Sequence, residues 1–375
     1  MSIHLRNRQR GFSLIEILVG AAIGLIGIVI IFQTLALTES RRRTTGAGSD
    51  TQLSGALALY TLERDLRLAG FGFSTAPELG CTVEATATAR GAFNFPLLPV
   101  QIVQGAAGAP DRLNVLWGNS PLFVNVQYFT ASTATTKATQ SSRAGLRPGD
   151  LVIAAGVVAG ATRCALLEIT DNGTDTITIT HTPGAGYTNA AGVATTAKFS
   201  SGAAPPVFTN GSLYNLGPTP GATPGATNPR RNVWSLSGSS LTVREDFTNI
   251  AAISVADSII DFQAEYGVDI SVAPPPNIQW TTTDPALAVW PKVRAIRVAL
   301  LSRSGEYEKT AVTPIAPTWL GNTMPTGAPS NAFVMRNVDG SADTNPAGPN
   351  NWRNYRYRVH EAVIPLRNVI WGTSP

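Results

Sequence analysis

A long apolar run near the N-terminus is the feature that most constrains this chain. From Ile17 to Phe32 there are sixteen consecutive residues without a polar side chain, and the wider run covers residues 12–37. A helix formed by residues 12–37 is about 39 Å long, whereas the hydrocarbon core of a membrane is about 30 Å thick. The sequence therefore predicts one membrane span at 12–37. No second run of this kind follows, so we expect the remainder to lie on one side of the membrane.

Composition argues against a disordered or polytopic chain. Of 375 residues, 43% are hydrophobic and 14% are charged, and 35 Gly with 26 Pro indicate a folded protein with many turns. The formal charge is +4, but Arg6, Arg8 and Arg10 lie in the first eleven residues. Without those residues, 25 basic side chains face 24 acidic ones. If this segment is a removable leader, strong binding to nucleic acid is not expected.

The residues at the start of the span form a motif. Arg8-Gln9-Arg10 leads into Gly11-Phe12-Ser13-Leu14-Ile15-Glu16, after which the apolar run continues. A carboxylate inside a span costs about 2.5 kcal/mol or more, so Glu16 needs a physical reason. This order of basic leader, glycine, phenylalanine, acid and apolar run resembles the signal of type IV prepilins and pseudopilins.

The resemblance implies processing and an assembly role. A prepilin peptidase would cut between Gly11 and Phe12 and methylate Phe12, which makes 1–11 the leader. Glu16 then becomes the fifth mature residue, and in this family that acid acts in subunit assembly, where it compensates the amine of a neighbouring subunit. The alternative is that Glu16 reaches the lipid headgroups. The family orientation puts the N-terminus in the cytoplasm and residues 71–375 in the periplasm, anchored in the inner membrane.

Apolar residues recur at helical spacing beyond the span and predict that the helix continues to residue 70. They are Leu53, Leu57, Leu59, Tyr60, Leu62, Leu66 and Ala69. Gly46 and Gly48 predict a local kink or melted turn, and Gly70 and Gly72 predict the helix end. Segment 62–71 resembles the helix end of PilW-type minor pilins and their J-type pseudopilin relatives.

Beyond residue 71 the chain alternates short β-like runs with turn residues, which predicts a sheet domain. Segments 205–231 and 313–351 are rich in Pro, Gly and Asn and are predicted to be long surface loops. The fold class is therefore α+β: a long N-terminal helix on a mainly antiparallel, pilin-like β-sheet head with long loops. The expected strands are 113–117, 124–129, 151–154, 166–170, 176–182, 233–236, 241–245, 259–266, 293–302 and 355–366, with turns at 171–173 and 237–240.

Several segments of the head also resemble the PilW-type family in their order along the chain. They are 149–152, 260–269, 290–298 and 364–368. The two predicted loops match no pattern of that family.

Two cysteines give the clearest prediction about the head. In an oxidising compartment, Cys81 and Cys164 most simply form a disulfide. The bridge would close 83 residue steps and stabilise the fold by up to about 4.5 kcal/mol. Two buried free thiols are the alternative. The wide spacing of the two cysteines in the sequence predicts no metal site.

No pattern predicts an enzyme or a cofactor. Outside the leader the imidazoles are His181 and His360, each in a strand-like segment, and the common nucleophile, phosphate and zinc motifs are absent from the sequence. One run alternates like the start of a calcium loop, but its sixth position is Thr344 and its twelfth, Asn350, is not acidic. Calcium is therefore the less favoured interpretation of that run, which comprises Asp339, Ser341, Asp343 and Asn345.

The resemblance to PilW-type pilins implies a structural role. Such subunits join other minor pilins to prime polymerisation of the major pilin, and they carry an adhesin at the pilus tip. Two alternatives remain open: a J-type pseudopilin of a type II secretion system, and a surface module that binds DNA or another ligand.

Overall fold

The computed structural model describes residues 13–122, 126–171, 175–202, 205–219, 228–324, 330–343 and 348–372. Gly11 and Phe12 lie outside these residues, as do Asn172 and Gly173 of one predicted turn and Thr344 and Asn345 of the calcium-like run. The chain divides into two compact units, Met1–Asp50 and Thr51–Pro375. We call the second unit the head.

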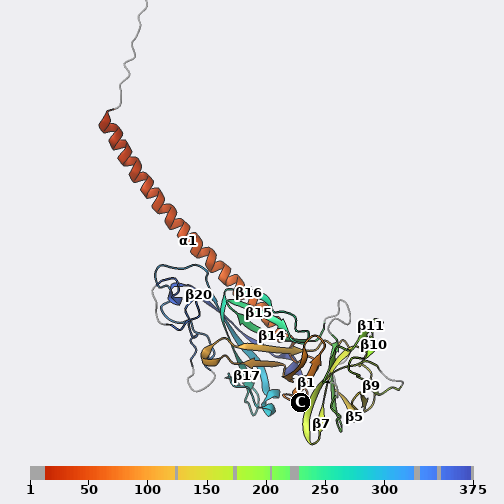
Figure 1. Cartoon of the computed structure of the whole chain (residues 1–375). Coiled ribbons are helices and arrows are strands. Elements are labelled where there is room, and N and C mark those ends of the chain that lie inside the picture. The colour runs from red at the N-terminus through yellow and green to blue at the C-terminus, as the bar shows by residue number, and fades with distance from the viewer. Residues whose placement is uncertain are drawn as a thin grey trace, which may run out of the picture. The chain divides into compact units, whose positions relative to one another are not determined.

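The long helix α1 spans Leu14–Leu68 (Figure 1). Its stretch Leu14–Ala36 is long and apolar enough to cross a membrane, and none of it is buried. The backbone is helical through Gly46 and Gly48, so the predicted melted turn is wrong. Hydrogen bonding along a long helix outweighs a cost of about 1 kcal/mol for each glycine. The helix ends just before Gly70, whose φ of 79° is a left-handed conformation that suits glycine at a helix C-terminus.

A nine-stranded sheet forms one part of the head, in the order β12-β1-β8-β7-β13-β5-β6-β9, with β2 paired to β1. All its pairs are antiparallel except β1 with β8. Its strands are β1 (Thr82–Ala87), β2 (Gly91–Pro96), β5 (Gln127–Ser132), β6 (Thr136–Thr139), β7 (Asp150–Val158), β8 (Ala161–Glu168), β9 (Thr178–Thr180), β12 (Phe199–Ser200) and β13 (Gly211–Pro218). A separate small hairpin joins β10 (Gly186–Thr188) to β11 (Ala194–Thr196).

Two further antiparallel sheets complete the head. The five-stranded sheet has the order β16-β15-β14-β4-β3, with β3 (Val100–Val103), β4 (Arg112–Trp117), β14 (Arg230–Ser237), β15 (Ser240–Glu245) and β16 (Ile253–Asp257). The four-stranded sheet has the order β18-β17-β19-β20, with β17 (Ile259–Asp269), β18 (Ile278–Thr281), β19 (Val293–Arg303) and β20 (Tyr357–Pro365). A short helix, α2 (Arg367–Gly372), follows β20. Figure 1 shows β17 and β20 at one end of the head and β5, β7 and β9 at the other.

The predicted α+β class and mainly antiparallel head are confirmed, and each predicted strand overlaps an observed one. The hairpin at 237–240 is also confirmed, because β14 pairs with β15 directly across it. The segment after β8 makes one isolated bridge, between Asp171 and Thr180. Otherwise β9 pairs with β6, so β8 and β9 are not the two arms of a hairpin.

The prediction of a long loop at 205–231 is wrong for its middle. Residues 211–218 form β13, which pairs with β5 on one side and β7 on the other. Leu213, Tyr214 and Leu216 are fully buried there. The β-like run is short, and the Pro, Gly and Asn residues on both sides of it made the whole segment resemble a loop in composition. Its central place in the sheet supplies the stability that its local sequence does not indicate.

Segment 313–351 contains isolated β-bridges but no named strand in its described residues, yet it is more than a surface loop. Trp319, Phe333 and Met335 are buried and pack with Trp352 against Ala299 and Leu301 of β19. The segment therefore covers the face of the four-stranded sheet that carries these residues. The opposite face, with Val298 and Leu300, belongs to the main core of the head.

Candidate assembly site

The start of α1 carries the first candidate residue. Glu16 lies in the first turn, where its main-chain N–H donates to the Ser13 carbonyl at 3.0 Å, and its side chain is exposed. The apolar side chains of the span that follow are also exposed. A surface of this kind requires lipid or other helices around it. Gly11 and Phe12 lie outside the described residues, so cleavage, methylation and the role of Glu16 remain predictions.

The part of α1 inside the head packs on the core through one face. Ala58, Leu62, Leu66 and Ala69 are fully buried at spacings of three and four residues. This confirms the predicted amphipathic packing for the second half of the pattern.

The first half of the predicted pattern faces outward instead. Leu53, Leu57 and Tyr60 are 70%, 50% and 66% exposed and lie at positions i, i+4 and i+7. They form one stripe on the helix surface, which we call the outer stripe. A soluble helix normally keeps that face polar, so the outer stripe is a candidate contact surface for another protein chain.

Asp65 fixes the helix on the five-stranded sheet. Its carboxylate accepts hydrogen bonds from the indole N–H groups of Trp117 at 2.8 Å and Trp234 at 2.7 Å, and from the Asn232 amide at 2.9 Å. Burial raises the pKa of Asp65, and the three donors partly oppose that shift. Sequence analysis missed this residue, although an acid three residues after Leu62 lies on the buried face and was the available signal.

The end of α1 is held by residues distant in sequence. The Asn368 side-chain amide of α2 donates to the carbonyls of Leu68 at 3.1 Å and Ala69 at 3.0 Å, and the Gly70 N–H donates to the Leu116 carbonyl at 2.9 Å. Helix ends leave carbonyls without helical partners, and Asn368 satisfies two of them. The C-terminal residues of the head thus fix where α1 ends.

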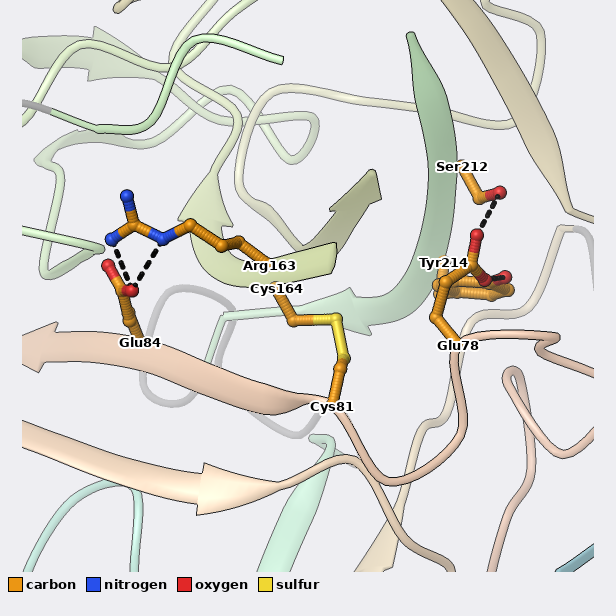
Figure 2. Close-up of a disulfide and its surroundings, with 7 residues drawn as sticks. All are labelled: Glu78, Cys81, Glu84, Arg163, Cys164, Ser212 and Tyr214. Carbon is orange, nitrogen blue, oxygen red and sulfur yellow. Dashed lines mark hydrogen bonds and ion pairs between the residues drawn. A yellow bond between two sulfur atoms is a disulfide. The ribbon is translucent and has the colours of Figure 1, made fainter. Parts of the chain in front are cut away.

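Cys81 and Cys164 are joined in a disulfide, which is the pairing that the sequence analysis predicted (Figure 2). Their Cα atoms are 6.1 Å apart, and their sequence separation is 83. The bridge connects the start of β1 to β8, beside the parallel pair Val83 and Cys164. It therefore ties the segment that leaves α1 to the centre of the nine-stranded sheet.

Polar contacts around the disulfide add to that connection. Glu84 of β1 pairs with Arg163 of β8, and Glu78 accepts hydrogen bonds from the hydroxyls of Ser212 and Tyr214 of β13 (Figure 2). Burial, together with the Glu78 carboxylate, raises the pKa of Tyr214 and keeps it protonated as a donor. Glu78 thereby bridges the segment after α1 to a strand three positions from β1 in the sheet order.

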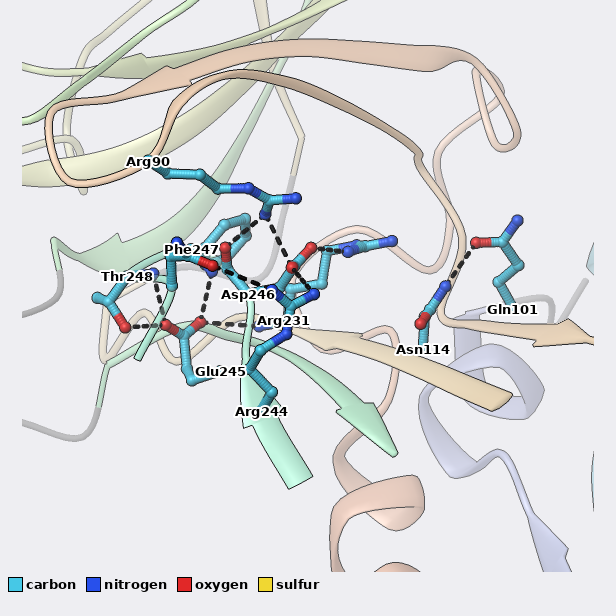
Figure 3. A network of polar contacts seen from close by, with 10 residues as sticks. Arg90, Gln101, Asn114, Arg231, Arg244, Glu245, Asp246, Phe247 and Thr248 are labelled. Atoms are coloured by element: carbon cyan, nitrogen blue, oxygen red, sulfur yellow. Dashed lines mark hydrogen bonds and ion pairs between the residues drawn. The ribbon is translucent and has the colours of Figure 1, made fainter. Parts of the chain in front are cut away.

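Three arginines converge on one buried acid beside the first residues of β14 and the last residues of β15 (Figure 3). Asp246 is 1% exposed, and its carboxylate contacts the guanidinium groups of Arg90 at 2.8 Å, Arg244 at 3.0 Å and Arg231. Arg90 comes from the turn between β1 and β2, so the cluster joins the nine-stranded sheet to the five-stranded one. Glu245 next to it accepts the N–H groups of Phe247 and Thr248.

Of the two candidate imidazoles, His181 is buried beside Lys137, which is also fully buried. The Lys137 ammonium lies 2.8 Å from His181 Nε2 and donates to the Thr133 carbonyl at 3.0 Å. Burial first, and Lys137 second, lower the pKa of His181 to about 3. Burial lowers the pKa of Lys137 to about 8. At neutral pH a neutral imidazole accepts from a lysine cation, so the pair is a packed structural contact.

This pair predicts acid sensitivity. Below pH 6.5 the unfolded chain protonates His181 but the folded chain does not, so His181 lowers the free energy of unfolding as pH falls from about 6.5 towards 3. At about 1.4 kcal/mol per pH unit, the loss between pH 7 and 4.5 is about 2–3 kcal/mol. Urea unfolding of the full chain in detergent at the two pH values should show this loss relative to His181→Gln.

The comparison with His181→Gln is needed because other groups act in the opposite direction. Burial raises the pKa of Asp111 and of Asp261 to about 7, so both stabilise the fold as pH falls. They are present in both proteins and cancel in the difference. Equal pH dependence in the two proteins would contradict the prediction.

His360 of β20 lies against α1. Its imidazole Nε2 is 3.1 Å from the Ser302 hydroxyl, and burial lowers its pKa. A Cβ added at Gly55 would lie 2.1 Å from His360 Nε2, so the absence of a side chain at Gly55 lets α1 approach this strand. His360 has a packing role here, which agrees with the interpretation of both histidines as parts of a sheet face.

The calcium-like run is not arranged as a calcium loop in its described residues. Asp343 pairs with Arg353 at 2.8 Å, and Asp339 accepts the N–H of Ser341 and the amide of Asn350. Among the residues that the structure describes, no group of three or more His, Cys, Asp or Glu side chains could hold a metal ion. These two acids serve to fold segment 313–351.

Comparisons with known proteins give matches to two parts of the chain, the N-terminal helix and the C-terminal half of the head. The family model described as Type IV Pilus-assembly protein W matches residues 227–368, and the model described as the prokaryotic N-terminal methylation motif matches residues 6–32. Together these two matches support a type IV pilin of the PilW kind. The PilW match covers the four-stranded sheet and segment 313–351, while the methylation motif contains Gly11, Phe12 and Glu16. Similarity to a pilus-assembly family implies contacts with other pilus components.

Among solved structures, a type IV-like pilin from Thermus thermophilus is similar over 40% of this chain and 73% of its own, with 16% identity and a TM-score of 0.21. No curated protein sequence matches the chain. The PilW assignment therefore rests on the two family models and the architecture described above.

Proposed function

We propose that this PilW-type pilin is a minor pilin that helps to prime the type IV pilus and lies at the base or the tip of the filament. The observation that carries the proposal is the methylation motif, which runs into an exposed apolar helix that is followed by a large β-rich head. Its helix would enter a filament, while a head of this size would limit the number of neighbours that it accepts. Other minor pilins and the major pilin are the proposed partners, with an adhesin at the tip.

The processing steps belong to the same proposal. Prepilin peptidase cuts between Gly11 and Phe12 and methylates Phe12, and residues 1–11 are lost. The N-terminus of α1 faces the cytoplasm and the head lies in the periplasm. A periplasmic head is consistent with the disulfide between Cys81 and Cys164, since that compartment is oxidising.

A clean gene deletion tests the proposal, with sheared surface pili and secreted proteins measured in parallel. We expect loss of surface pili of at least about tenfold with normal secretion, because a filament without its priming complex starts rarely. The wild-type gene supplied in trans should restore pili. Normal pili with failed secretion would instead identify a J-type pseudopilin, and normal pili with normal secretion would reject both roles.

A further inference from the structure

The last strand of the four-stranded sheet has a long open edge. Strand β20 has nine residues and pairs with β19 alone, in continuous register without a bulge. Other edge strands in the described part of the head are shorter: β12 has two residues, β9 three, β3 and β18 four, β16 five and β2 six. Of these, β16 also has a register shift in its pairing with β15. The edge of β20 is therefore the longest and most regular one.

The hydrogen-bond ladder shows which main-chain groups of β20 face away from β19. At its two ends the Ser304 N–H donates to the Arg356 carbonyl and the Leu366 N–H donates to the Arg294 carbonyl, each at 2.8 Å. Because antiparallel pairs alternate, the even-numbered residues of β20 bond to β19 and the odd-numbered ones point outward. The outward residues are Tyr357, Val359, Glu361 and Val363. The structure shows no hydrogen bond from a described residue to their main-chain groups.

This edge lacks most of the features that normally prevent strand pairing. Protected edges carry charged side chains, lysine above all, an internal proline, a bulge or a short strand, and of these β20 has only the charges of Arg358 and Glu361. Strand β20 has no lysine, and its one proline, Pro365, is its last residue. Val363 is 53% exposed beside the open groups. The edge thus offers eight main-chain donors and acceptors together with apolar surface.

A groove runs between this edge and α1. Its volume is about 450 Å³, and it is open to solvent. Leu59 and Tyr60 of α1 supply apolar surface, while Arg358 and Glu361 of β20 and Glu63 of α1 supply charges. Tyr60 belongs both to this groove and to the outer stripe. A pilin helix that packs along the outer stripe would therefore bring its own head next to β20.

We propose that the open edge of β20 accepts an extended segment from the head of a neighbouring pilin, which becomes a fifth strand of the sheet. This inference rests on the proposed function. Main-chain hydrogen bonds to residues 357–363 give affinity, and side chains of the incoming strand fill the groove in alternation. The segment should carry an apolar residue over Leu59 and Tyr60, next to polar residues that match Arg358 and Glu63.

Val363→Pro tests the edge without disturbing the sheet. Proline removes an outward N–H and places its ring where the incoming strand would lie, whereas the bonds to β19 come from Ala362 and Ile364. The matched control is Val363→Thr, which keeps the N–H and the β-branched shape. In a deletion strain we expect Val363→Thr to restore pili and Val363→Pro to leave them at least about tenfold lower, at equal membrane levels of oxidised protein.

Hydrogen exchange gives a second measurement that does not depend on a variant. The full-length chain is purified in detergent, alone and with the other pilins of its host. In the complex, the amides of Val359, Glu361 and Val363 should exchange at least about tenfold more slowly than in the isolated chain. Unchanged exchange in a formed complex would overturn the proposal, as would full piliation by Val363→Pro. Slowing in the isolated chain at high concentration would replace the neighbouring pilin with a second copy of this chain.

These outcomes are separate from failure of the proposed function. If the deletion strain has normal pili, the minor-pilin role fails whatever Val363→Pro does. If deletion removes pili and Val363→Pro restores them, only the strand-pairing inference fails.

Discussion

Replacing Asp246 with alanine is expected to lower the free energy of unfolding of the head by about 4–5 kcal/mol. Breaking a buried ion pair from one side typically costs about 3–5 kcal/mol, because the remaining charge is left without compensation. Here the change leaves three guanidinium groups, those of Arg90, Arg231 and Arg244, around an empty position. Arg231 is already disfavoured as a cation, since burial is the main influence lowering its pKa.

Such a loss is large against a domain stability of about 5–15 kcal/mol. Urea-dependent pulse proteolysis of the full-length chain in detergent measures it, with the disulfide intact in every sample. Arg244→Ala is the matched control, because that side chain is the most exposed of the three, at 37%, and its removal leaves Asp246 paired with Arg90 and Arg231, so the loss should be smaller. Equal effects of Asp246→Ala and Arg244→Ala would show that the cluster does not depend on its central carboxylate.

The same cluster illustrates what sequence can and cannot predict in this fold. Arg90 and Asp246 are 156 residues apart, and each lies in a turn whose own residues give no sign of a partner. Local patterns indicated the strands around them, including the Ser237–Ser240 hairpin, because alternation and turn residues act within a few positions. Long-range polar pairing has no such local signal. Asp65 differs, since its place on the apolar face of α1 could have predicted a buried partner.

Strand β13 and segment 313–351 show a second limit. The composition of both regions predicted loops, and composition reports on local backbone preference. In β13, central pairing with β5 and β7 overrides that preference and buries Tyr214. In 313–351 the backbone remains irregular, as predicted, yet Trp319 and Phe333 form a core that the proline and glycine content concealed. Aromatic residues within such a segment were the signal that it covers a sheet face.

The disulfide was predictable for a different reason. With only two cysteines in the sequence, a single pairing within the chain exists, and the question was reduced to the redox state of the compartment. That compartment was itself inferred from the residues before α1. The N-terminal motif therefore supported two predictions, the location of the head and the oxidised state of its two cysteines. The open edge of β20, by contrast, could be recognised only once the strand order was known.

Glu16→Ala is expected to abolish surface pili without lowering the amount of chain in the membrane. A carboxylate among packed apolar helices is costly, but it becomes favourable when it compensates the N-terminal amine of an adjacent subunit. Alanine removes that compensation and makes the span more apolar, so membrane insertion should be normal while assembly loses its register. The deletion strain carrying Glu16→Ala should then show at least about tenfold fewer sheared pili than the strain carrying the wild-type gene.

Two control variants and a mass measurement distinguish loss of the Glu16 charge from a change in side-chain shape and from failed cleavage or methylation. Glu16→Gln keeps the length of the side chain but not its charge, so it should fail like alanine if pairing with the amine is the cause. Ser13→Ala changes a polar residue in the same region and should assemble normally. Intact-mass measurement should show loss of residues 1–11 and one added methyl group in every variant, which keeps peptidase recognition apart from assembly. Normal piliation by Glu16→Ala would leave the headgroup interaction as the role of Glu16, because that role does not require a neighbouring subunit.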